Sequence, residues 1–94
     1  MSFKIVLQSE ALLDIQEAFE WYEDQLNGLG YDFIEEIENC YMKLSAHPGF
    51  YTFINEKYRR IKTNRFPYLL VYEIDGDKVI INSVYHVKRK FSFE

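Results

Sequence analysis

Hydrophobic residues recur along this chain with two different periods. Between residues 9 and 46 they recur every three or four positions, the spacing of one face of an α-helix. Asn27-Gly28-Leu29-Gly30 interrupts this pattern, and His47-Pro48-Gly49 ends it. The pattern predicts two helices: one begins after an N-cap at Ser9 and runs to Leu26, and the other follows Gly30. So short a loop predicts an antiparallel helical hairpin.

The remaining hydrophobic segments are short, rich in β-branched and aromatic residues, and bounded by turn residues. They predict strands at residues 3–7, 58–62, 65–74 and 78–86, with a tight turn at Asp75-Gly76-Asp77. The order β-α-α-β-β-β predicts an α+β fold, an antiparallel four-stranded sheet with the helical hairpin packed on one face. The two most hydrophobic strands, 65–74 and 78–86, are expected at the centre of the sheet.

Length and composition indicate one folded domain spanning residues 1–94. Hydrophobic residues make up 48% of the chain and aromatic residues 18%, which excludes a disordered chain. No hydrophobic stretch is long enough to cross a membrane, and no basic segment followed by a hydrophobic run opens the chain, so we expect a cytoplasmic protein. The lone Cys40 lies on a hydrophobic helical stripe and is expected to be a buried structural residue.

Charge is distributed unevenly between the two parts of the chain. The net charge is −4 overall, but residues 1–55 carry −8 and residues 56–94 carry +4. The acidic helices are interpreted as a solvated surface, whereas the second part is where an anionic partner would bind. The candidate residues for binding such a target are Arg59, Arg60, Lys62, Arg65, Lys88, Arg89 and Lys90. The competing interpretation of the first four is an edge strand kept soluble by charge.

Several fragments, in this order and over nearly the whole chain, resemble the RelE/ParE toxin family, and in particular its plasmid-stabilisation subgroup. They are Ser9-Glu10-Ala11 with Asp14-Ile15, Trp21-Tyr22-Glu23, Phe33-Ile34-Glu35-Glu36-Ile37, His47-Pro48, Tyr58-Arg59-Arg60-Ile61, the run Arg65-Phe66-Pro67-Tyr68-Leu69-Leu70-Val71-Tyr72, and Ser83-Val84-Tyr85-His86-Val87-Lys88-Arg89. The resemblance implies the toxin of a bacterial type II toxin–antitoxin pair, which inhibits growth and is neutralised by a cognate antitoxin protein.

Two modes of action follow from the resemblance. RelE-type members cleave messenger RNA on the ribosome, whereas ParE-type members bind and inhibit DNA gyrase. Arg60, Lys62, His86 and Arg89 are the catalytic candidates for a ribonuclease, which needs cations and an acid or base around the reacting phosphate. However, Leu69 stands where the resemblance places an arginine, and Phe93 stands near the position of a terminal tyrosine. The ParE-like mode is therefore favoured, and a non-toxic relative that only binds an antitoxin is a further alternative.

Some residues have simpler interpretations. His86 is more typical of a strand-end histidine that bonds the neighbouring backbone, and His47 of a helix C-terminus. Tyr58, Tyr68, Tyr72 and Tyr85 are more typical of core or interface residues than of base-stacking platforms. No metal-ligand spacing or nucleotide-binding motif is present, so no metal or cofactor is expected.

Overall fold

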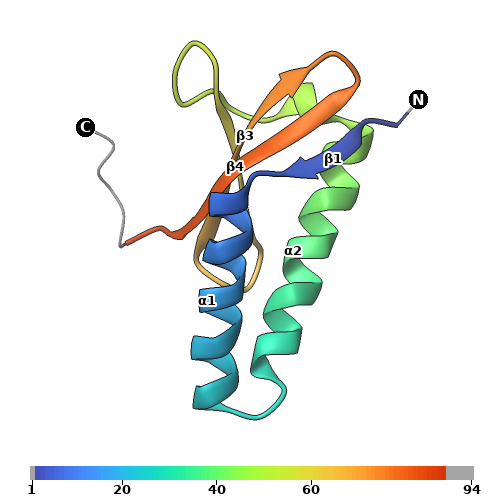
Figure 1. Cartoon of the computed structure of the whole chain (residues 1–94). Helices are drawn as coiled ribbons and strands as arrows, with labels where there is room; N and C mark the ends of the chain where they lie inside the picture. The colour runs from blue at the N-terminus through green and yellow to red at the C-terminus, as the bar shows by residue number, and fades with distance from the viewer. Residues whose placement is uncertain (1, 89–94) are drawn as a thin grey trace.

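The predicted order of elements is confirmed in a computed structural model, which describes residues 2–88 (Figure 1). The elements are β1 (Lys4–Leu7), α1 (Ser9–Gln25), α2 (Leu29–Ala46), the 3₁₀ helix η1 (Pro48–Phe50), β2 (Arg59–Lys62), β3 (Tyr68–Asp75) and β4 (Lys78–His86). The predicted cap at Ser9 is wrong: the N-cap position is Gln8, which makes no side-chain capping bond, and Ser9 is the first helical residue.

The sheet is mixed, with strand order β1-β4-β3-β2. β2, β3 and β4 form the predicted antiparallel meander with β3 and β4 at the centre, but β1 pairs parallel to β4. The prediction of an antiparallel sheet is therefore wrong for β1 and confirmed for the other three strands. The reason is the helical hairpin, which returns the chain to the start of β1: the Phe3 amide donates to the Ser45 carbonyl at the end of α2 over 2.9 Å. The first strand of the meander, β2, therefore runs in the same direction as β1. Because β3 and β4 each reverse direction, β4 runs parallel to β1.

The core lies between the helical hairpin and one face of the sheet. Figure 1 shows the two helices side by side and antiparallel. Helical spacing brings Ala11, Ile15 and Ala18 of α1 to this interface, as predicted from the hydrophobic pattern. The other buried members are Phe33, Ile37, Cys40 and Leu44 of α2 and Ile61, Phe66, Tyr68, Leu70, Tyr72, Val79, Ile81 and Val84 of the sheet region.

Aromatic rings fill the part of the core between the helices and the β2–β3 turn. The ring of Phe33 lies 5.5 Å from that of Phe66 and 5.0 Å from that of Tyr68, both edge to face. Tyr22 of α1 meets Phe66 at 4.8 Å between ring centroids. These separations are those of favourable aromatic pairs, so the rings supply much of the buried area in a short chain.

The turn between the helices depends on two glycines and one carboxylate. Gly28 has φ +94°, a conformation that favours glycine. Glu23 accepts hydrogen bonds from the amides of Gly28 and Gly30, at 2.8 and 2.9 Å. Gly30 is buried against α1, where an added Cβ would lie 2.7 Å from the carbonyl oxygen of Phe19. These hydrogen bonds and the close packing at Gly30 hold the two helices together at this end.

Two further helical carboxylates bind backbone amides of the sheet. Glu36 accepts from the amides of Asn64 and Arg65 in the β2–β3 turn, at 2.7 and 2.9 Å. Asp14 accepts from the amide of Val84 in β4 over 2.9 Å. The acidic helices are thus not simply a solvated surface, because these side chains connect the hairpin to the sheet.

Replacing Gly30 with alanine should destabilise the fold. The new methyl group meets backbone at Phe19, and the shift that this forces costs about 1–3 kcal/mol. Most of that range exceeds the ~1 kcal/mol that alanine otherwise contributes to a helix. The change in the free energy of unfolding is measured by denaturant titration. Gly49→Ala is the control, since an added Cβ meets nothing within 4 Å there; equal stability of the two variants would contradict the expectation.

Candidate functional site

The sheet face opposite the helices carries a pair of cations. Ile61, Leu70 and Val84 are in register and buried under the hairpin. Because side chains alternate along a strand, the neighbours of these residues point to the other face. They form a surface that we call the cationic face: Arg60 and Lys62 of β2, Leu69 and Val71 of β3, and Ser83 and Tyr85 of β4.

The cationic face has exposed charges at one edge and a hydrophobic centre. Arg60 and Lys62 are exposed, and neither forms a salt bridge within residues 2–88. Val71, in register with Arg60, is only 5% exposed although no helix covers it. Burial raises the pKa of Tyr85, while the nearby Arg60 guanidinium opposes part of that rise. The Tyr85 phenol therefore stays protonated at neutral pH.

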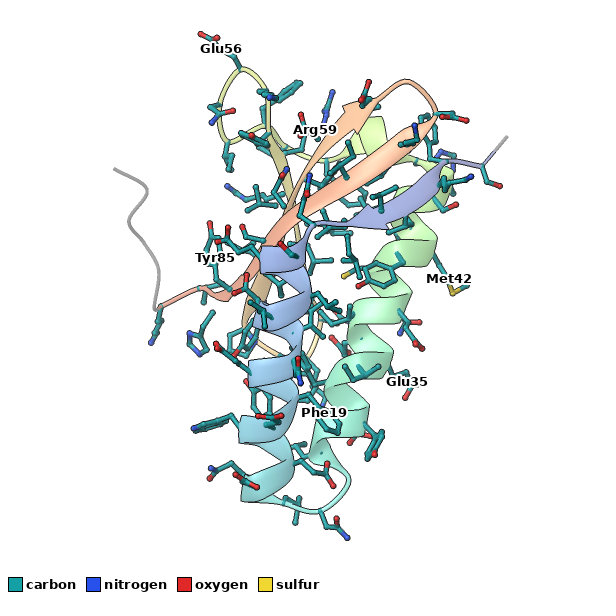
Figure 2. All side chains as sticks on the ribbon, viewed as in Figure 1. Phe19, Glu35, Met42, Glu56, Arg59 and Tyr85 are labelled. Carbon is teal, nitrogen blue, oxygen red and sulfur yellow. The ribbon has the colours of Figure 1, made fainter. Side chains whose placement is uncertain are left out.

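Arg59 does not belong to this face. Its Nη1 donates to the carbonyls of Gly49 and Tyr51, at 3.1 and 2.8 Å, and its guanidinium lies 3.8 Å from the centroid of the Phe53 ring. Arg59 and Tyr85 lie apart along the sheet, because Arg59 is level with Ile81 in the middle of β4 and Tyr85 is near the end of that strand (Figure 2). The contacts of Arg59 therefore do not support the prediction that it binds a target. Its guanidinium instead binds carbonyls and an aromatic ring of the loop before β2.

Arg65 is also directed elsewhere. It lies in the β2–β3 turn, where its Nη1 is 3.3 Å from a carboxylate oxygen of Asp32 in α2. Its own amide is held by Glu36 of the same helix. Both acceptors lie on the helical side of the sheet, so Arg65 does not join Arg60 and Lys62.

The end of β4 lies at the same end of the sheet as Lys62. Tyr85 is in register with Leu69, which pairs in turn with Lys62. His86 accepts a hydrogen bond at Nδ1 from the Lys88 amide over 3.0 Å, and its ring packs edge to face on Tyr68. This is the backbone-bonding role predicted for His86. Lys88 is exposed next to it, whereas the predicted residues Arg89, Lys90 and Phe93 lie outside the described residues.

The geometry of the cationic face suits binding better than phosphoryl chemistry. Arg60 and Lys62 provide two positive charges on one edge, as their spacing predicts. Between Lys62 and Tyr85 stands Leu69, whose hydrophobic side chain cannot neutralise a developing phosphorane charge. Tyr85 is held in its protonated form, so it is a poor general base at neutral pH. The face therefore combines two exposed cations with a hydrophobic centre.

A groove that the sequence did not indicate lies between α1 and the end of β4. We call it the α1–β4 groove. Trp21 stands at it with 58% of its surface exposed, and its ring packs edge to face on Tyr22. It is lined by Asp14, Glu17, Ala18, Trp21 and Tyr22 of α1, by Tyr68, Val84, Tyr85 and His86 of the sheet, and by Lys88. Trp21 is the residue that could have pointed to this groove from the sequence. The other lining residues come from distant parts of the chain, so the sequence did not bring them together.

Other chemistries find little support in residues 2–88. This part of the chain contains no group of three His, Cys, Asp or Glu side chains that could hold a metal ion. None of its helices is long and hydrophobic enough to span a membrane. Cys40 is buried in the core, as predicted, and burial raises its pKa to about 11. His47 caps the C-terminus of α2, again as predicted.

Comparisons with known proteins agree with the fold. Residues 5–91 match the family described as "ParE toxin of type II toxin-antitoxin system, parDE". A solved structure titled "Chromosomal ParDE TA system from P. aeruginosa" superposes with a TM-score of 0.73 at 16% sequence identity, covering 90% of this chain and 96% of that chain. At that identity the likeness concerns the fold. No curated protein sequence matches the chain.

The Cys40 thiol should be unreactive in the folded protein. The thiolate is the reactive form, and at pH 8 a thiol with a pKa of about 11 contains roughly a hundredth of the thiolate present at the ordinary 9.0. A colourimetric disulfide reagent should therefore label native protein at least about 100-fold more slowly than protein unfolded in denaturant. Equal rates in the two states would contradict the burial.

Proposed function

Because the chain belongs to the ParE toxin family of type II toxin–antitoxin systems, we propose that it inhibits growth by binding a macromolecular target, such as DNA gyrase, through the cationic face. A cognate antitoxin neutralises it in this proposal. The observation that carries the choice of surface is the side-by-side placement of Arg60 and Lys62, exposed and without a salt-bridge partner among the described residues.

Binding is favoured over catalysis by the residues around this pair. Leu69 lies beside Lys62 in the adjacent strand, and Val71 lies beside Arg60. The cationic face offers the partly exposed Leu69 beside two cations, which suits an acidic protein surface that also contributes hydrophobic contacts. It lacks the additional charge that a phosphate-cleaving centre needs.

A second candidate function, ribosome-dependent cleavage of messenger RNA, is favoured by the same Arg60 and Lys62, since paired cations also bind phosphates. The two functions differ in their products. A gyrase-binding toxin reduces supercoiling and leaves ribosome-bound mRNA intact, whereas a ribonuclease cleaves the mRNA and leaves supercoiling unchanged.

Purified protein should inhibit DNA supercoiling by gyrase, and the double substitution Arg60→Ala, Lys62→Ala should weaken that inhibition. We expect about a tenfold loss, equivalent to roughly 1.4 kcal/mol of binding free energy, and a larger loss at low salt, where charges are less screened. Inhibition is measured as the concentration that halves supercoiling.

Arg65→Ala is the matched control, because Arg65 pairs with Asp32 away from the cationic face. It should inhibit as the unmodified chain does. Cleavage of ribosome-bound mRNA without any effect on supercoiling would reject gyrase as the target. Equal inhibition by the double variant and the control would reject the cationic face as the binding surface.

A further inference from the structure

A second hydrophobic surface lies at the end of the sheet that carries the β3–β4 turn. The start of β1 and the end of α2 meet there, since the Phe3 amide donates to the Ser45 carbonyl (Figure 1). A hollow in this surface is lined mainly by Phe3, Ala46, Pro48, Phe50, Tyr51 and Ile74. We call these six residues the Phe50 patch, because Phe50, at 80%, is the most exposed large hydrophobic residue within residues 2–88.

The backbone around Phe50 is held in place although the ring is exposed. Arg59 Nη1 donates to the carbonyls of the two residues that flank Phe50, at 3.1 and 2.8 Å. The buried Tyr72 hydroxyl donates to the Pro48 carbonyl over 2.6 Å, and the Phe50 ring packs edge to face on Tyr51. A large aromatic residue on a loop that is already ordered loses less entropy on binding, so it is suited to anchor an interface.

We propose that the Phe50 patch pairs with the same patch of a second copy of this chain, and that Phe50 of each copy enters the hollow of the other. A two-fold dimer needs a surface that is complementary to itself. Here an exposed ring and a hydrophobic hollow lie side by side, so each copy supplies both. The inference goes beyond the proposed function and does not depend on it.

The charges around the patch favour a second copy over a partner of one sign. Lys4 and Lys78 are in register at the starts of β1 and β4, and Asp75 and Asp77 lie at the β3–β4 turn. All four are exposed, and none forms a salt bridge within residues 2–88. Two positive and two negative charges can pair across a two-fold axis, whereas a strongly acidic or strongly basic partner meets two like charges.

The size of the patch predicts a weak dimer. A standard interface involves roughly 20–30 residues a side, and the patch with its four charges provides less than about half of that. We therefore expect a dissociation constant on the order of 10 μM. Arg60 and Lys62 stay exposed in this dimer, since their register partners Val71 and Leu69 lie further from the β3–β4 turn than Ile74 does. One dimer then carries two cationic faces.

Sedimentation velocity of the full chain at several concentrations measures the association. Phe50→Ser removes the ring, and Ala46→Trp fills the hollow from an exposed position. The matched control is Tyr31→Ser at the start of α2, which removes a ring that is 66% exposed and, like Phe50, makes an edge-to-face contact at 5.0 Å. Each patch variant should dimerise at least about tenfold more weakly, and the control within about twofold of the unmodified chain.

A mixture of the two patch variants gives a result that misfolding cannot imitate. Neither variant can place a ring in a hollow within its own dimer. In a mixed dimer, Phe50 of the Ala46→Trp copy enters the free hollow of the Phe50→Ser copy. The mixture should therefore associate more tightly than either variant alone, and a mixture that does not would contradict the proposal.

Three other results would overturn the dimer. The first is an unmodified chain that stays monomeric at about 100 μM, well above the expected dissociation constant. The second is equal dimerisation of Phe50→Ser and Tyr31→Ser. The third is a monomer that binds vesicles of phosphatidylcholine and phosphatidylglycerol through Phe50, which would assign the patch to a membrane surface. A monomer that still inhibits gyrase would reject the dimer and leave the proposed function intact.

Discussion

The burial of one face of the sheet under the helical hairpin is the constraint on which the rest of the structure depends. Side chains alternate along a strand, so once Ile61, Leu70 and Val84 face the helices, their neighbours must face away. A slip of one residue would move the hydrophobic set to solvent and the charges into the core. The cationic face is therefore a consequence of the same packing that stabilises the fold.

The hairpin is attached to the sheet by polar contacts as well as by hydrophobic ones. Asp14 and Glu36 reach from the two helices to backbone amides of β4 and of the β2–β3 turn. Charged acceptors bind amides more strongly than neutral ones do. Asp14 also occupies an edge amide that β1 does not reach, which protects the end of β4 from pairing with another chain. Acidic residues on these helices thus contribute to the architecture and to the character of the α1–β4 groove.

The cationic face and the α1–β4 groove differ in the charges around them. Arg60 and Lys62 are exposed at one edge of the sheet, whereas Asp14 and Glu17 line the groove together with Lys88, so the groove carries charges of both signs. Tyr85 is the point where the surfaces approach each other, because its side chain belongs to both.

Local patterns in the sequence were sufficient for the order of the elements, the buried faces of the helices, the central place of β3 and β4, and the adjacency of Arg60 and Lys62. Each of these follows from periodicity over a few residues, which the backbone geometry translates directly into a face. The buried state of Cys40 was predicted on the same basis, and the backbone bond of His86 was predicted from its place at the end of a strand; both are confirmed.

Contacts between distant segments decided the rest. The parallel pairing of β1 with β4 depends on where the hairpin returns the chain, which no local pattern encodes. Arg59 and Arg65 have the same chemistry as Arg60, but a loop carbonyl and a helical carboxylate, 10 and 33 residues away along the chain, bind them. The groove likewise combines α1 with a strand some seventy residues later, as the bond between Asp14 and Val84 shows. The sequence shows which charged and aromatic side chains are present. Tertiary packing decides which of them bind other parts of the protein and which remain exposed to a partner.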